Sequence, residues 1–119
     1  EGLKEGLKKM HELEKEFDTN LFVPGSKEGL NVELDKAIHL RDFFTMGQLV
    51  AFDALSRNES CGGHFREEYQ TEEGEAKRDD ENYFYVGCWE YKGKGVEPEL
   101  SKEPLEYEAI KVQTRNYKN

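Results

Sequence analysis

Hydrophobic residues recur at helical spacing near the start of the chain. Over residues 1–19 the apolar positions return every three or four residues, with charged residues between them. The stripe consists of Leu3, Leu7, Met10, Leu13 and Phe17. This pattern predicts an amphipathic helix that packs one face against a neighbour. Pro24 and Gly25 then signal a turn.

A second helix is predicted from Asn31, a good N-cap residue, to about residues 55–57. Glu33 and Asp35 fall in its first turn, where the helix dipole favours anions. Between residues 34 and 55 the apolar positions cover more than one stripe, so several sides of this helix should be buried. One helix cannot cover them all. We therefore expect both that the C-terminal segment wraps this helix and that another element is missing from this chain. We also expect an exposed helix face through which the chain self-associates.

The second half of the sequence predicts loops and two strands. Residues 58–82 are polar and without helical or strand periodicity, which indicates a loop or irregular structure. Residues 83–91 cluster aromatic residues and Val, which is typical of a strand. Residues 105–114 alternate apolar and polar positions, with a phase slip at Ala109 and Ile110 that is typical of a bulge. The two runs predict an antiparallel ribbon.

The predicted fold is mainly α: an antiparallel helical bundle followed by a C-terminal β ribbon and extended tail. The helical hairpin occupies residues 1–57 and the loop and ribbon occupy residues 58–119. We assign both to one domain, since 119 residues fit a single small domain. The chain begins with a helical pattern that no cap or initiator Met precedes, so we expect it to be part of a longer protein.

Composition narrows the function classes. Charged residues make up 36% of the chain and the net charge is −9, so the basic face that nucleic-acid binding requires is lacking. The longest apolar stretch, residues 49–52, is too short to span a bilayer, and no signal-peptide pattern is present. Cys61 and Cys88 permit one disulfide, but two cysteines favour reduced thiols in the cytoplasm.

No catalytic, metal or cofactor site is predicted. Cys61 and His64 form one loose pair, whereas a structural zinc site usually shows two tight ligand pairs. The same two residues are too close in sequence for a typical thiol nucleophile and its base. Charge runs such as Glu67 and Glu68 are more typical of a solvated face. No glycine motif lies between a strand and a helix, so a dinucleotide site is not supported.

The stretch 58–83 favours docking against another surface. A Gly-Gly pair lets the backbone approach a neighbour closely or adopt positive φ. Arg and His donate directional hydrogen bonds, and carboxylates accept them. The same charges can also pair only within the loop, but ordering such a polar stretch alone is costly. We predict docking, and the residues assigned to it are Gly62, Gly63, His64, Arg66, Arg78, Asp79 and Asp80.

The stretch "ALSRNESCGGHFREEYQTEEGEAKRDDENYFYVGCWEY" resembles the C-terminal helical domain of the fumarate reductase and succinate dehydrogenase flavoprotein subunit. The resemblance extends over about residues 1–117. The positions that match the family series are Arg57, Glu59, Ser60, Gly62, His64, Arg66, Arg78, Asp79, Asp80 and Glu81. Cys61-Gly62-Gly63 replaces the more common Arg-Gly-Ala, and Glu67-Glu68 replaces a Glu-Asp pair.

This resemblance implies a spectrin-repeat-like three-helix bundle whose first helix this chain lacks. It also implies a parent subunit that interconverts fumarate and succinate with FAD and passes electrons through an iron–sulfur subunit to a quinone. Such a complex lies on the cytoplasmic side of the inner membrane. The motifs for that chemistry belong to upstream domains, so we expect this chain to hold no FAD and to dock on the flavin-binding domain and the iron–sulfur subunit.

Two alternatives stay open. The chain is also compatible with a free-standing acidic helical protein-interaction module. The L-aspartate-oxidising flavoenzymes share the implied architecture, but they fit the motifs less well.

Overall fold

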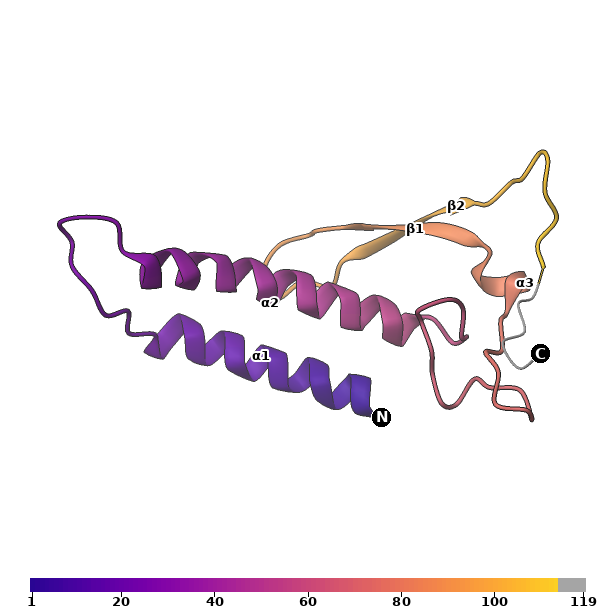
Figure 1. Cartoon of the computed structure of the whole chain (residues 1–119), viewed down its shortest axis with the longest axis horizontal. Coiled ribbons are helices and arrows are strands. Elements are labelled where there is room, and N and C mark those ends of the chain that lie inside the picture. The colour runs from indigo at the N-terminus through magenta and orange to yellow at the C-terminus, as the bar shows by residue number, and fades with distance from the viewer. Residues whose placement is uncertain (114–119) are drawn as a thin grey trace. The chain divides into compact units, whose positions relative to one another are not determined.

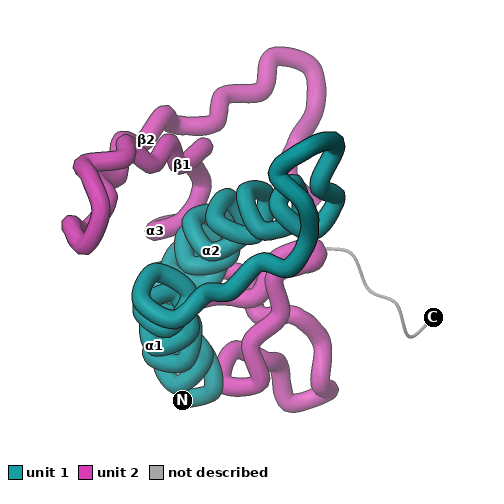
Figure 2. The backbone as a smooth tube through the Cα atoms, turned by 90° about the vertical axis from the view of Figure 1, so that its left-hand side faces the viewer, with its two compact units in different colours: residues 1–57 teal, residues 58–119 magenta. Residues whose placement is uncertain are grey.

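The computed structural model describes residues 1–113 and divides the chain into two compact units, Glu1–Arg57 and Asn58–Asn119 (Figure 2). The first unit is a helical hairpin and the second contains a short helix and a two-stranded sheet. Within the described residues, this confirms the predicted mainly helical fold with an antiparallel ribbon.

The first unit consists of α1 (Gly2–Asn20) and α2 (Val32–Ser56), which lie side by side (Figure 1). Both helices fall where the hydrophobic spacing predicts them. Asn31 caps α2 as expected: its side-chain oxygen accepts hydrogen bonds from the backbone N–H groups of Glu33 and Leu34, each at 3.1 Å.

Two types of contact join α1 and α2. The rings of Phe17 and Phe44 meet edge to face with centroids 5.6 Å apart. Arg41 pairs with Asp18 and places its guanidinium over the Phe17 ring. A further hydrogen bond of 2.7 Å runs from the Gln48 amide to the Glu14 carboxylate. An aromatic contact with polar pairs beside it therefore joins the two helices. Met10 of α1 also lies against α2 at Gly47, where an added Cβ would be 3.4 Å from the Met10 sulfur.

The turn between the two helices requires glycine at one position. Gly25 has φ of 122°, and a Cβ there would lie 2.5 Å from the side-chain nitrogen of Asn31. The same nitrogen donates a 3.1 Å hydrogen bond to the carbonyl of Pro24. Asn31 thus caps α2 and fixes the preceding turn.

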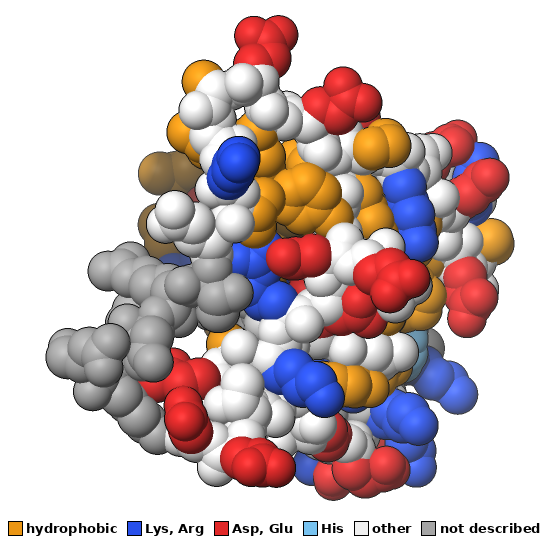
Figure 3. Space-filling model, turned by 90° about the vertical axis from the view of Figure 1, so that its right-hand side faces the viewer, with side chains coloured by type: hydrophobic (Ala, Val, Ile, Leu, Met, Phe, Trp, Pro, Cys, Tyr) orange, Lys and Arg blue, Asp and Glu red, His pale blue; other side chains and the backbone are white. Residues whose placement is uncertain are grey.

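Much of the apolar surface of α2 remains exposed, as its all-round hydrophobic pattern predicts. Ile38, Phe43 and Val50 are 60%, 67% and 64% exposed. Among residues 1–113 no hydrophobic side chain is fully buried. On the face of the molecule shown in Figure 3, hydrophobic side chains reach the surface between acidic and basic ones.

The second unit carries α3 (Asp80–Tyr83) followed by β1 (Tyr85–Glu90) and β2 (Glu99–Pro104). The strands pair antiparallel, from Tyr85 opposite Pro104 to Glu90 opposite Glu99. β1 lies inside the predicted strand 83–91, so that prediction is confirmed. Helix α3 was not predicted, because residues 58–82 were interpreted as loop.

The prediction of the second strand at residues 105–114 is wrong: β2 ends at Pro104, directly before that stretch. Continuing the register of the β1–β2 ladder would place residues 106–109 opposite residues 80–83. Those residues form α3, so they are not an extended strand with which residues 106–109 could pair. Pairing therefore ends after one further backbone bond, from Leu105 N–H to the Phe84 carbonyl. Residue 114 lies outside the described residues.

Lys92 compensates a charge conflict at the end of the ribbon where residues 91–98 connect the two strands. Glu90 and Glu99 lie directly opposite each other, which is unfavourable for like charges. The Lys92 ammonium contacts the carboxylates of both, at 2.7 and 2.8 Å. These two hydrogen bonds raise the pKa of Lys92 above its ordinary value of 10.5.

Candidate functional site

The predicted docking segment begins with a tight turn at Cys61–His64. The two residues exchange backbone hydrogen bonds of 2.8 and 3.1 Å, which closes a two-residue loop containing Gly62 and Gly63. Only Gly62 of this pair has a positive φ, 58°. Positive φ at the first central position is the pattern of a type II′ turn. Both glycines are exposed, so the turn presents bare backbone to its surroundings.

A second hairpin turn follows at Thr71–Glu75. Thr71 N–H donates to the Glu75 carbonyl at 2.8 Å, and Gly74 N–H donates to the Thr71 carbonyl at 2.9 Å. Gly74 adopts φ of 81°. A turn with glycine in the left-handed region next to the returning strand is typical of a hairpin with a bulge. The stretch interpreted as loop is thus ordered by two glycine turns.

Two buried polar residues connect these turns. Glu59 is 3% exposed and Ser60 is fully buried, and they are the most buried residues of the described chain. The Ser60 hydroxyl accepts from Arg66 N–H at 2.8 Å and bonds the Arg66 carbonyl at 3.2 Å. Ser60 N–H donates to the carbonyl of Lys77 at 2.9 Å. A polar pair therefore occupies the position that hydrophobic side chains take in most small domains.

The Arg66 side chain is largely covered and contacts several neighbours. Its guanidinium donates to the Asn58 side chain at 2.9 Å, lies over the Tyr69 ring at 4.9 Å and is 3.7 Å from the Glu68 carboxylate. The pKa of Glu68 is lowered, first by a hydrogen bond from its own backbone N–H and then by the positive charge of Arg66. Arg66 therefore stabilises the segment from within.

The remaining predicted residues gather around α3. Asp79 is its N-cap: the carboxylate accepts from Asn82 N–H at 3.2 Å. The N–H of Asp79 donates to the buried carboxylate of Glu59 at 3.1 Å. Arg78 donates two hydrogen bonds to one oxygen of Asp80, at 2.9 and 2.6 Å.

The structure thus separates the seven predicted residues into two groups. Gly62, Gly63 and His64 belong to the first turn, where His64 is half-buried. The other four contact residues of their own unit: Arg66, Arg78, Asp79 and Asp80. Reasoning from the sequence did not assign a role to Glu59 and Ser60, although both belong to the series of matched positions. The buried Glu59 carboxylate accepts from the N–H of Asp79, twenty residues further along the chain. No local sequence pattern marks such a contact.

The described residues do not fit an FAD site. A dinucleotide cradle needs a glycine turn between a strand and a helix, with the helix N-terminus towards the pyrophosphate. Here the glycine turn of residues 61–64 leads into a further hairpin, and the sheet found in residues 1–113 is an antiparallel ribbon. Across those residues no group of three or more His, Cys, Asp or Glu is arranged to hold a metal ion.

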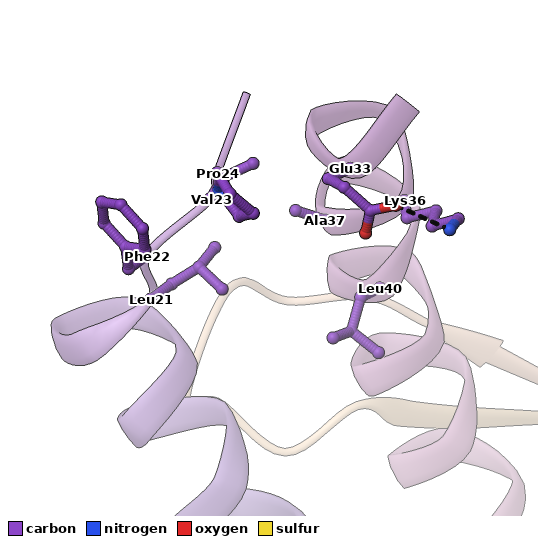
Figure 4. A pocket seen from close by; sticks show the side chains of 8 residues that line it. All are labelled: Leu21, Phe22, Val23, Pro24, Glu33, Lys36, Ala37 and Leu40. Carbon is purple, nitrogen blue, oxygen red and sulfur yellow. Dashed lines mark hydrogen bonds and ion pairs between the residues drawn. The ribbon is translucent and has the colours of Figure 1, made fainter. Parts of the chain in front are cut away.

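A hollow of about 220 Å³ lies at the turn of the helical hairpin. Figure 4 shows the side chains that line it. Leu21 lines it from the segment after α1, and Leu40 lines it from α2. The charged groups on its rim, Glu33 and Lys36, pair with each other at 2.9 Å. This hollow is smaller than typical cofactor pockets, which hold about 300–1,000 Å³. Its lining is suited to an apolar side chain rather than to a nucleotide.

The described residues provide neither a membrane-spanning helix nor a disulfide. Within residues 1–113, no helix combines the length and apolar character needed to cross a bilayer. Cys61 is half-buried and Cys88 is exposed, and neither forms a disulfide.

Comparison with protein families identifies the family of this chain. The model of the fumarate reductase flavoprotein C-terminal region matches residues 1–117, nearly the whole sequence. The chain therefore belongs to the family of fumarate reductase flavoprotein C-terminal domains, as its motifs indicated. Searches of curated proteins and of solved structures found no match.

Proposed function

We propose that this chain is the C-terminal part of a flavoprotein subunit that interconverts fumarate and succinate. The match of residues 1–117 to the flavoprotein C-terminal family carries this proposal. In the parent protein, FAD and the dicarboxylate bind to other domains. Electrons pass through an iron–sulfur subunit to quinone, in a complex on the cytoplasmic side of the inner membrane. The residues of this chain take no catalytic part.

The role proposed for the chain itself is to dock on the flavin-binding domain and the iron–sulfur subunit. The exposed turn Gly62–Gly63, with the neighbouring His64, provides the contact surface. Arg66, Arg78, Asp79 and Asp80 support it by holding the backbone of residues 58–83 in one shape. A turn held by buried hydrogen bonds loses little conformational entropy when it binds.

The exposed face of α2 provides a second contact. Phe43 and Val50 are apolar, largely exposed and seven residues apart, so they share one side of the helix. We propose that this face packs against another part of the parent protein, and against a second copy when the chain is isolated.

Substitution of Gly62 tests the docking surface without disturbing the turn. Asn tolerates positive φ better than most residues, and a Cβ at Gly62 meets no atom within 4 Å. Gly62→Asn should therefore fold normally but place a side chain between the turn and its partner. Binding to the flavin-binding domain encoded upstream, measured by calorimetry, should weaken about tenfold, equivalent to roughly 1.4 kcal/mol.

Gly95→Asn is the matched control, because Gly95 also has positive φ, 75°, and open space around its Cβ position. It lies outside the docking segment and should bind like the wild type. Equal affinities of wild type and Gly62→Asn would refute docking through this turn. The reading frame upstream of Glu1 tests the broader assignment: it should encode a flavin-binding glycine motif, and its absence would favour a free-standing interaction module.

A further inference from the structure

The segment 105–113 is attached to the second unit at both ends. At its start, Leu105 N–H donates to the Phe84 carbonyl at 3.2 Å, and the Tyr107 ring meets the Phe84 ring edge to face at 5.8 Å. At its end, the carbonyl of Gln113 accepts a 3.1 Å hydrogen bond from the Arg78 guanidinium. Between these attachments Ile110 is 66% exposed. The segment therefore spans two anchor points, and Arg78 supplies the second.

The orientation of Arg78 is fixed by its other contacts. Nε and Nη2 both donate to Asp80 Oδ1, which leaves Nη1 directed at the Gln113 carbonyl. Asp80 is itself the first residue of α3, which the Asp79 cap and the buried Glu59 carboxylate hold in place. The Asp80 hydrogen bond also raises the pKa of Arg78, so the guanidinium stays charged.

We propose that Arg78 and Asp80 form a clasp that holds the C-terminal segment 105–113 against the second unit. With the clasp closed, Arg78 joins Asp80 to Gln113. With the clasp open, the segment is released beyond Tyr107, whose ring still contacts Phe84. Two of the seven residues predicted to dock are thereby positioning residues for the segment 105–113. This inference goes beyond the proposed function and holds whether or not the chain docks on a flavin domain.

The clasp requires arginine. Its guanidinium presents donors in several directions from one rigid plane, so it can hold Asp80 and Gln113 together. A lysine ammonium keeps the charge but concentrates its donors at one point. Arg78→Lys should therefore retain the contact with Asp80 and lose the bond to Gln113.

Limited proteolysis of the full chain at glutamate residues tests the clasp. Cleavage at Glu108, followed by intact mass, reports release of the segment, and cleavage in the Thr71–Glu75 turn provides an internal reference. Arg78→Ala and Asp80→Asn should each raise the ratio of the two rates about threefold to tenfold, as expected for loss of one solvent-exposed hydrogen bond. Arg78→Lys should behave like Arg78→Ala.

Lys77→Ala is the matched control, since it removes a neighbouring cation and leaves the clasp intact. It should give the wild-type ratio. Hydrogen exchange of the β1 and β2 amides identifies any variant that unfolds the whole unit. If Arg78→Ala does so, the comparison of the milder Asp80→Asn with the wild type decides the test. An unchanged ratio in Asp80→Asn with protected strands, or an equal rise in Lys77→Ala, would overturn the clasp.

Discussion

The two units of this chain reach order by opposite means. The helical hairpin of residues 1–57 is built from apolar periodicity, yet it leaves side chains such as Phe43 and Val50 largely in solvent. The unit that begins at Asn58 is highly charged, yet it contains the most buried residues described, Glu59 and Ser60. The hairpin thus leaves apolar surface exposed, whereas the second unit is held by its own hydrogen bonds.

This difference shows that hydrophobic content and burial are separate properties. In the hairpin, hydrophobic residues outnumber the positions that two helices can cover. In the second unit, a serine and a glutamate satisfy backbone groups that would be costly to bury alone. Destabilising substitutions should therefore act differently in the two units: through lost apolar contact in the hairpin and through lost hydrogen bonds in the second unit.

The largest effect is expected from Glu59→Ala. This change removes the buried acceptor of Asp79 N–H and weakens the capping of α3. The free energy of unfolding of the second unit should fall by about 2–3 kcal/mol, the cost of a hydrogen bond to a charged group. Urea denaturation followed by a Trp89 signal measures it. Glu67→Ala, at an exposed position, should stay within about 0.5 kcal/mol of the wild type; similar losses in both variants would contradict the role of Glu59.

A smaller effect is expected in the hairpin, where two adjacent phenylalanines provide a matched pair. Phe44→Ala removes the edge-to-face contact with Phe17 and should cost about 1–2 kcal/mol in helical stability by thermal circular dichroism. Phe43→Ala alters an exposed ring and should cost less than about 0.5 kcal/mol. It should also reduce any concentration-dependent association in sedimentation. Equal losses of stability in Phe44→Ala and Phe43→Ala would mean that the Phe43 side of α2 is packed rather than exposed.

The smallest effect concerns the pH dependence of the ribbon. Because the folded-state pKa of Lys92 is raised, its stabilising contribution is fully present below the ordinary value of 10.5. It is lost as the pH rises through the higher folded value, when Glu90 and Glu99 face each other uncompensated. Exchange of the β1 and β2 amides, corrected for intrinsic rates, should rise in that window. Lys92→Met should remove this step; a step that persists in the variant would assign it to another group.

The helices could be predicted from the sequence because their signals are local. Hydrophobic spacing located α1 and α2, and Asn31 marked the start of α2 within one residue. Strand β1 was also predicted, since aromatic residues and Val cluster there. Each of these signals lies within the element that it predicts.

The errors concern features that depend on distant residues. β2 was misplaced because residues 105–112 alternate as a strand does, whereas actual pairing is decided by the partner residues, which turn into α3. That helix forms where Asp79 caps it and Glu59, twenty residues earlier, holds the cap. For the candidate site, the sequence predicted docking on another surface through residues that include Arg66, Arg78 and Asp80, with pairing inside the loop as the alternative. The contacts described for them lie within their own unit, and docking stays a prediction.

The incomplete burial of apolar side chains has a calorimetric consequence. The heat-capacity change of unfolding comes mainly from apolar surface newly exposed to water, and for ordinary domains it is about 12–15 cal/mol/K per residue. Side chains such as Ile38, Phe43 and Val50 are already hydrated in the native hairpin and add little to it. The isolated chain should therefore show a flatter stability curve than a conventional domain of its length, with weak dependence on temperature on either side of its maximum.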